Sequence, residues 1–241
     1  MKIIEVKNIS KVFNGIVALN NVSFELDENK TIGLIGPNGS GKSTTIGILL
    51  GLIKESSGKI YIKKTLVSDA NRPEFLKMMN FASPYTELPK RLTVMQNLKI
   101  YARLYDIRNT KDRLEEIYNY FELENLLNKK TGELSSGQKT KVSLAKALIN
   151  KPEILLLDEP TASLDPVVSD YLRRFITEYK KKNNISILFS SHDMQEAQNL
   201  CDKIIILEKG VVKEQGNVID ILEKYKKGNL KEIYFEIFGE K

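Results

Sequence analysis

Apolar and polar positions change their spacing twice along this chain. Near the start, apolar residues form short runs of the kind that build strands. From about Pro84 to Leu148 they recur at the three- and four-residue spacing of helices. Short apolar runs and helical segments then alternate, so the pattern predicts an α/β core interrupted by a helical insertion. The expected strands are 2–6, 22–26, 31–35, 153–159, 185–191 and 203–207, and the expected helices outside the insertion are 43–52, 167–182 and 193–200.

The end of the chain has a pattern of its own. In residues 231–241, apolar and charged side chains alternate in the manner of an edge strand. We expect this segment to pack on the rest of the protein, and no motif in it indicates a function.

Length and composition indicate one large domain, or one domain with a sizeable insertion. The chain has 241 residues, of which 41% are hydrophobic and 28% are charged, an ordinary balance for a soluble globular protein. Its one cysteine, Cys201, has no partner for an internal disulfide, which favours a reducing compartment. The first twenty residues carry four charges, which argues against a secretory signal, and apolar runs such as 46–53 are too short to cross a bilayer.

The charge balance adds little to this picture. The 37 basic and 31 acidic side chains give a net charge of +6, which could suit nucleic acid, anionic lipid or phosphate ligands. The lysines are scattered, however, and the short runs 129–130 and 180–182 are typical of solvated helix ends. The charge alone therefore indicates no particular partner.

The strongest chemical signal is a glycine-rich turn between an expected strand and an expected helix. Gly36, four further residues and then Gly41-Lys42-Ser43 match G-x-x-x-x-G-K-[ST], the pattern of a phosphate-binding loop. Glycines let backbone N–H groups approach phosphate oxygens, and the helix N-terminus adds unpaired donors and a partial positive charge. In this pattern Lys42 reaches the β and γ phosphates, and the Ser43 hydroxyl binds Mg²⁺. The expected nucleotide contacts are Gly36, Pro37, Asn38, Gly39, Ser40, Gly41, Lys42, Ser43 and Thr44.

Two carboxylates close the apolar run at 153–159. In α/β sheets, ligand chemistry gathers at the carboxyl ends of buried strands. We expect Asp158 to hold Mg²⁺ through water, and Glu159 to polarise the water that attacks the γ-phosphate. A strand that simply runs into a polar loop is the plainer alternative, but the phosphate-binding loop makes it less favoured.

Two further features lie on either side of the two carboxylates in the sequence. LSSGQ opens a lysine-containing helix between the loop and the two carboxylates, and His192, the sole histidine, follows an expected strand. With these motifs over almost the whole chain, the sequence resembles the ATP-binding cassette (ABC) ATPases. The motifs are KVFNG (11–15), GPNGSGKST (36–44), LSSGQ (134–138), ILLLDEP (154–160), ASLD (162–165) and SSHDMQEAQNLCDKIIIL (190–207).

The resemblance implies a fold and a set of roles. The fold is an α/β P-loop NTPase core of the ABC type, with an antiparallel β subdomain and a helical subdomain that carries the signature LSSGQ. The boundaries would be 1–83 and 150–241 for the core and 84–149 for the helical subdomain. Phe13 would stack on adenine, and Lys42, Glu159 and His192 would be the catalytic residues, with ATP and Mg²⁺ as cofactors.

The resemblance also implies a dimer. In the family, the signature of one subunit closes over the ATP that is held by the phosphate-binding loop of the other. The implied partners are therefore ATP, a second copy or a paralogous cassette placed head to tail, and a separate membrane permease. The nucleotide contacts implied in this second half-site are Ser135, Ser136, Gly137, Gln138 and Asp165.

One family motif is missing. The family has a glutamine after the strand that follows the first helix, where it contacts Mg²⁺ and the attacking water. No glutamine occurs between Met78 and Met95, and Ser83 stands at the corresponding position. The departure puts this part of the metal shell in doubt, so Ser83 is not assigned as a ligand.

The leading expectation is an ATP-hydrolysing subunit of a membrane transporter, at the cytoplasmic face of the membrane through its permease. PYTELPKRLTV (84–94), PTASLDP and SSHDMQEAQNLCD resemble bacterial exporters more than importers, so we expect export. The alternatives are an importer ATPase, a non-transport ABC ATPase that acts on nucleic acid or ribosomes, and an ATP-binding module without turnover. Nucleic acid is not expected as a partner, and the sequence does not identify the transported substrate.

Overall fold

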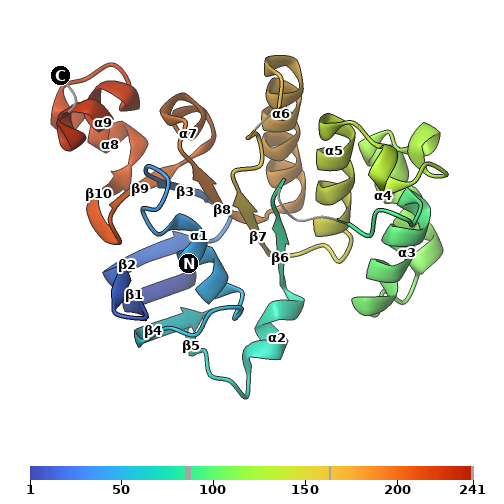
Figure 1. The fold of residues 1–241 in the computed structure, drawn as a ribbon, viewed down its shortest axis with the longest axis horizontal. Coiled ribbons are helices and arrows are strands. Elements are labelled where there is room, and N and C mark those ends of the chain that lie inside the picture. The colour runs from blue at the N-terminus through green and yellow to red at the C-terminus, as the bar shows by residue number, and fades with distance from the viewer. Residues whose placement is uncertain (85–87, 163, 240–241) are drawn as a thin grey trace.

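The described part of the chain forms two sheets and a group of helices (Figure 1). The computed structural model describes residues 1–84, 88–162 and 164–239. Within these ranges, no helix combines the length and the apolar character that a membrane span requires.

The first sheet is antiparallel and contains the N-terminus. Its order is β2(Ile16–Asp27), β1(Lys2–Phe13), β4(Ser57–Ile62) and β5(Thr65–Leu66). Strands β1 and β2 extend beyond the apolar runs at 2–6 and 22–26, because the two strands pair as one hairpin. The turn of this hairpin has positive φ angles of 47° at Asn14 and 84° at Gly15. Asn-Gly is the dipeptide that tight hairpins of this kind favour.

The second sheet carries the predicted core strands and has the order β10-β9-β3-β8-β7-β6. All neighbouring pairs are parallel except β9 with β10. Strands β3, β7 and β8 are buried along their whole length, which accounts for their continuous apolar sequences. The strand bounds are β3(Thr31–Ile35), β6(Met79–Ala82), β7(Ile154–Asp158), β8(Ser186–Ser191), β9(Lys203–Glu208) and β10(Val211–Asn217).

The second sheet lies between two apolar layers. On one face, alternate strand residues such as Leu34 and Leu156 pack with the first sheet and with α1(Lys42–Leu49). On the other face, residues such as Leu157 and Phe189 pack with the remaining helices. These helices are α3(Val94–Leu104), α4(Thr110–Phe121), α5(Ser136–Ala147), α6(Pro166–Asn183), α7(Met194–Leu200), α8(Val218–Tyr225) and α9(Leu230–Phe238), while the short α2(Arg72–Lys77) precedes β6.

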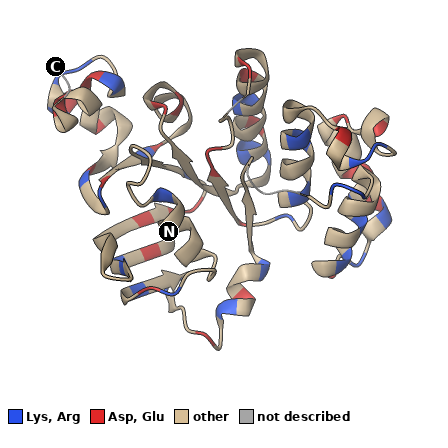
Figure 2. Ribbon diagram, viewed as in Figure 1, with Lys and Arg blue, Asp and Glu red and all other residues tan. Residues whose placement is uncertain are grey.

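The helical insertion consists of α3, α4 and α5, which lie together beyond the β6 edge of the sheet (Figure 1). Capping boxes begin two of these helices: Thr93 with Gln96 at α3, and Ser135 with Gln138 at α5. Lysine and arginine occur on these helices, on α6 and on the first sheet, which matches the scattered charge of the sequence (Figure 2).

The structure corrects the prediction for the C-terminal segment. Residues 231–241 were expected as an edge strand, but α9(Leu230–Phe238) covers most of this segment and residues 240–241 lie outside the described ranges. Asn229 caps the helix, and Leu230 and Ile233, three positions apart, are fully buried. The predicted packing of this segment on the rest of the protein is confirmed, because α9 contacts α7 and α8.

Two predicted boundaries also shift. The helix expected at 43–52 ends at Leu49, because Gly51 takes a left-handed φ of 72°. The strand expected at 153–159 is shorter, Ile154–Asp158, and β4, which begins at Ser57, was not predicted. The structure adds further elements that the apolar pattern did not predict: β5, α2, β6, β10 and α8.

The loop between β3 and α1 is crowded at two positions where the sequence has glycine. A Cβ atom on Gly36 would lie 2.2 Å from the carbonyl oxygen of Leu207. At Gly41, φ is 109°, and a Cβ atom would lie 2.6 Å from the Leu19 side chain. Glycine here lets the chain turn tightly between the two sheets, in addition to any ligand contact.

A buried lysine joins the insertion to the sheet. Lys146 on α5 donates a hydrogen bond of 2.9 Å to the carbonyl oxygen of Phe81 on β6, and its ammonium lies 5.5 Å from the centroid of the Tyr101 ring. Burial lowers the pKa of Lys146 to about 8.

The lowered pKa of Lys146 predicts that the free energy of unfolding increases at alkaline pH. Between pH 8 and 10.5 the unfolded chain keeps the proton that folded Lys146 loses, so the free energy of unfolding rises with pH through this window. Relative to a Lys146→Met variant, the wild-type protein should gain about 2 kcal/mol between pH 7.5 and pH 10. Urea unfolding of both proteins at the two pH values measures this difference, and equal changes in both would show that Lys146 is not the source.

The Gly36 contact gives a second prediction. Gly36→Ala should lower the free energy of unfolding by about 1–3 kcal/mol, because the new methyl group would overlap the Leu207 carbonyl. The control is Gly228→Ala, where a Cβ atom meets nothing within 4 Å; it should change stability by less than about 0.5 kcal/mol. Urea unfolding at neutral pH measures both values, and equal values would contradict the proposed overlap.

Candidate active site

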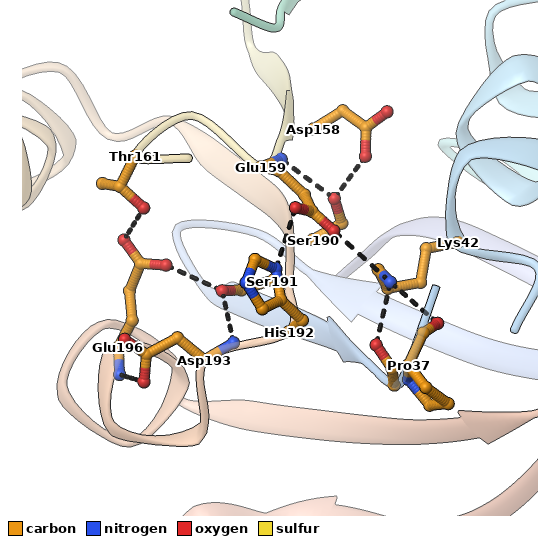
Figure 3. Close-up of polar contacts among 11 residues, drawn as sticks. Pro37, Lys42, Asp158, Glu159, Thr161, Ser190, Ser191, His192, Asp193 and Glu196 are labelled. Atoms are coloured by element: carbon orange, nitrogen blue, oxygen red, sulfur yellow. Dashed lines mark hydrogen bonds and ion pairs between the residues drawn. The ribbon is translucent and has the colours of Figure 1, made fainter. Parts of the chain in front are cut away.

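Lys42 lies at one end of a polar cluster at the carboxyl edge of the second sheet (Figure 3). It is the first residue of α1, and its side chain is 5% exposed. Its ammonium donates hydrogen bonds of 2.8 Å to the Gly36 carbonyl and 3.2 Å to the Pro37 carbonyl. It also lies 3.4 Å from Oε1 of Glu159, which connects the glycine-rich loop to the end of β7.

The two predicted carboxylates occupy the end of β7 and the residue after it. Asp158 ends the strand and accepts a hydrogen bond from the Ser190 hydroxyl on β8. The backbone N–H of Glu159 donates to both the carbonyl and the hydroxyl oxygens of Ser190, at 3.1 Å each. Glu159 has a φ of 49°, a left-handed backbone that non-glycine residues seldom adopt and that is often found at functional sites.

His192 meets Glu159 directly. It follows the last residue of β8, and its Nδ1 lies 2.9 Å from Oε2 of Glu159. The His192 side chain is 58% exposed, whereas that of Glu159 is 13% exposed. The two oxygens of Glu159 are therefore divided between Lys42 on one side and His192 on the other (Figure 3).

Asp158, Glu159 and His192 line one cleft of about 660 Å³, next to the buried Lys42 ammonium. Asn38 and Ser43 come from the loop and α1, Asp158 and Glu159 from β7, and His192 from the segment after β8. The structure thus brings together the predicted phosphate-binding, metal-binding and catalytic residues from three separate stretches of sequence.

Ser43 and Asp158 fit the magnesium chemistry predicted for them. Both side chains face the same cleft, and one oxygen of Asp158 is already orientated by Ser190. Among the described residues, no group of three or more His, Cys, Asp and Glu side chains could form a metal site made of protein ligands alone. A hydroxyl and a carboxylate beside a phosphate-binding loop suit Mg²⁺, which takes few protein ligands and completes its shell with phosphates and water.

Other predicted nucleotide contacts lie outside this cleft. Phe13 is half exposed at the tip of the β1–β2 hairpin, where the Lys11 ammonium lies 4.7 Å from the ring centroid. Asp165 accepts hydrogen bonds from the N–H groups of Val167 and Val168, and so caps α6. Ser163, in the same predicted motif, lies outside the described residues.

The signature residues form a separate helix start. Ser135 caps α5, and Ser136, Gly137 and Gln138 form its first turn. None of these four residues lines the 660 Å³ cleft. Within one chain, the phosphate-binding loop and the signature therefore belong to different surfaces.

Ser83, which replaces the family's glutamine, follows β6 and is buried. It lines a second cavity, of about 280 Å³, together with Pro84, Leu134 and Leu164. The stretch 84–94, whose sequence resembles exporters, includes residues 85–87, which lie outside the described ranges. The structure gives no reason to assign Ser83 to the metal.

Several residues of the site were not predicted as such, among them Thr161, Ser190, Ser191 and Glu196. Glu196 is 1% exposed and accepts hydrogen bonds from Thr161 and Ser191. Burial raises the pKa of the Glu196 carboxyl above its usual value, and the two hydroxyl donors oppose this shift. A sequence signal existed, since two serines end an otherwise apolar strand, but a glutamate in a short helix is usually on the surface.

Comparison with known proteins agrees with this geometry. The family model described as ABC transporter matches residues 19–162. The chain is 34% identical to the sulfate/thiosulfate import ATP-binding protein CysA of Synechocystis sp., over 90% of this chain and 61% of that protein. It is 32% identical to the Nod factor export ATP-binding protein I of Rhizobium johnstonii, over 92% of this chain and 71% of that protein. The chain thus spans about three fifths of the length of the first relative.

Solved structures of the same kind superimpose closely on this one. A structure described as the ATP binding subunit of an ABC transporter has a TM-score of 0.87 and 32% identity, over 98% of this chain and 99% of that chain. A dimeric bacterial ABC transporter cassette, MJ0796, has a TM-score of 0.79 and 26% identity, over 89% of this chain and 98% of that chain. The resemblance and the fold class inferred from the motifs are confirmed, and the chain belongs to the ABC transporter family as one of its ATP-binding ATPase cassettes.

Proposed function

We propose that this chain hydrolyses ATP as one of two cassettes that power a separate membrane permease. The observation that carries the proposal is the position of Glu159, whose carboxylate lies between Lys42 of the phosphate-binding loop and His192. A carboxylate held in this way beside a phosphate-binding site is placed to act as a general base.

The loop and α1 supply the binding half of the reaction. Backbone N–H groups at the start of α1 and in the glycine-rich loop hold the β and γ phosphates, and the helix N-terminus adds a partial positive charge. The Lys42 ammonium stabilises the negative charge that develops on the transferred phosphoryl group. Phe13, on the neighbouring hairpin, offers an exposed aromatic face for the adenine.

Glu159 and His192 supply the hydrolytic half. Glu159 accepts a proton from the attacking water, and its contact with His192 keeps the carboxylate turned toward the cleft. His192, more than half exposed, also presents its ring to the γ-phosphate. When bound through Ser43 and Asp158, Mg²⁺ neutralises charge on the β and γ phosphates.

A dimer would complete the site. Ser135 to Gln138 form a helix start that does not line the chain's own cleft, so a second cassette placed head to tail would bring this helix start to the bound ATP. A structure of the similar cassette MJ0796 is described as dimeric, which supports a dimer of cassettes. ATP would then be part of the interface, and its hydrolysis would loosen the dimer.

We propose export as the direction of transport, on the resemblance of 84–94, 160–166 and 190–202 to exporters. The relatives include proteins named for sulfate/thiosulfate import and for Nod factor export, so an importer is the direct alternative. In either case the cassette would lie at the cytoplasmic face of the membrane, held there by the permease.

Glu159→Gln tests the hydrolytic role. The amide cannot accept a proton from water, so turnover at saturating ATP should fall by at least about a hundredfold. The variant should also accumulate an ATP-bound dimer, because binding is retained while release by hydrolysis is blocked. Phosphate release and size-exclusion chromatography with ATP measure the two effects.

Lys42→Ala should act earlier, by weakening nucleotide binding itself.

The matched control is Glu153→Gln, at the other end of β7. Glu153 is half exposed and pairs with Lys63, away from the cleft, so this variant should keep wild-type turnover. If Glu159→Gln were as fast as this control, Glu159 would not be the base. An ATP-loaded Glu159→Gln protein that stays monomeric at every concentration would contradict the dimer.

Membrane attachment tests the transport role. The protein should remain on washed membranes while the membrane protein that co-purifies with it is present, and should leave them when that partner is deleted. In inside-out vesicles that hold both proteins, ATP added outside should drive an exported substrate into the lumen. Salt-sensitive binding to RNA or DNA, with no membrane attachment, would favour the non-transport alternative.

A further inference from the structure

Glu196 is a buried carboxylate that takes no part in the reaction proposed above. It lies in the first turn of α7, and Asp193 fixes this turn by accepting hydrogen bonds from the N–H groups of Gln195 and Glu196. Its Oε1 accepts a hydrogen bond of 2.5 Å from the Thr161 hydroxyl, and its Oε2 accepts one of 2.7 Å from the Ser191 hydroxyl. Both oxygens are therefore occupied by hydroxyl donors from two other parts of the chain (Figure 3).

These two donors belong to the segments that carry the catalytic pair. Thr161 is two residues after Glu159, and Ser191 immediately precedes His192. The Ser191 hydroxyl oxygen also accepts a hydrogen bond of 3.0 Å from the N–H of Asp193, so its own hydrogen is directed to Glu196. The carboxylate thus spans the gap between the two loops.

Glu159 and His192 need such a support. The Glu159 backbone has a left-handed φ of 49°, which surrounding contacts must maintain. The His192 side chain is 58% exposed and has little packing of its own. Hydrogen bonds to a charged group are stronger than neutral ones, so a buried carboxylate with two donors can hold both loops.

We propose that Glu196 is a positioning residue for ATP hydrolysis, which holds the loops of Glu159 and His192 at the separation where the two side chains meet. The inference rests on the proposed function and deepens it. In this role Glu196 acts through Thr161 and Ser191, whose hydroxyls occupy its two carboxylate oxygens, and not through a contact with the nucleotide or the attacking water.

Glu196→Ala should separate catalysis from binding. Turnover at saturating ATP should fall by about tenfold to a hundredfold, because a small misplacement of catalytic groups has effects of that order. The dissociation constant for ATP should change by less than about twofold, because the hydrogen bonds of the Glu196 carboxylate go to Thr161 and Ser191 and, among the described residues, none goes to the phosphate-binding loop. Steady-state phosphate release and equilibrium binding of a fluorescent ATP analogue measure the two quantities on the full chain.

The control variant and the conservative variant both change residues of α7. Gln195→Ala removes an exposed side chain next to Glu196 and should leave turnover at the wild-type level. Glu196→Gln keeps the size and one acceptor oxygen, and should be at least about threefold faster than Glu196→Ala. A merely structural role would lower the thermal stability and ATP binding along with turnover.

A double-mutant cycle tests whether Glu196 affects turnover through Ser191. If Glu196 acts through Ser191, then Ser191→Ala should slow turnover by itself, and adding it to Glu196→Ala should cause less than about a twofold further loss. Should Glu196→Ala fail to fold, Thr161→Val and Ser191→Ala each remove one of the two hydrogen bonds. Each should then slow turnover by at least about threefold with ATP binding intact.

The inference would be overturned if Glu196→Ala had the same turnover as Gln195→Ala, or if Glu196→Ala lost only affinity for ATP. It would also be overturned if the losses of turnover caused by Glu196→Ala and Ser191→Ala multiplied independently in the double variant. If Glu196→Ala fails to fold, wild-type turnover in both Thr161→Val and Ser191→Ala would also overturn it. A wild-type protein without ATP hydrolysis would instead refute the proposed function itself.

Discussion

The pairing of β7 with β8 in the interior of the protein is the contact on which the site depends. Both strands are buried along their whole length and run parallel, so both end at the same edge of the sheet. The N–H of Glu159 extends the pairing by one residue, since it donates to the carbonyl and the hydroxyl oxygens of Ser190. Glu159 and His192 can meet only because the strands before them are held side by side by burial and hydrogen bonding.

The sequence predicted best the parts of the fold that are determined by the burial of apolar side chains. Continuous apolar runs located β3, β7, β8 and β9 to within a residue or two, because complete burial leaves little ambiguity. Partly exposed elements were harder to predict. The β1–β2 hairpin extended beyond the apolar runs through Asn14-Gly15, and the segment 231–241 alternates in a way that suits a strand, while the spacing of Leu230 and Ile233 and the Asn229 cap favour the helix that forms.

The site was predictable where a motif carries its own chemistry. The spacing of Gly36, Lys42 and Ser43 defines a phosphate-binding loop, and the structure places it beside the predicted carboxylates. The contacts around the catalytic pair could not be predicted, because they join residues that are distant in sequence. Glu196 looks like an ordinary helix glutamate until the fold brings Thr161, 35 positions away, to its carboxylate.

The hydrogen bonds of Lys42 to the carbonyls of its own loop set a condition on what can bind there. An incoming anion has to offer acceptors that replace the oxygens of Gly36 and Pro37. A phosphate chain presents several oxygens to one ammonium, whereas a simple monovalent anion such as chloride presents a single point of charge. The loop therefore favours a phosphate chain over chloride by a competition within the protein, before any contact with the base or the sugar.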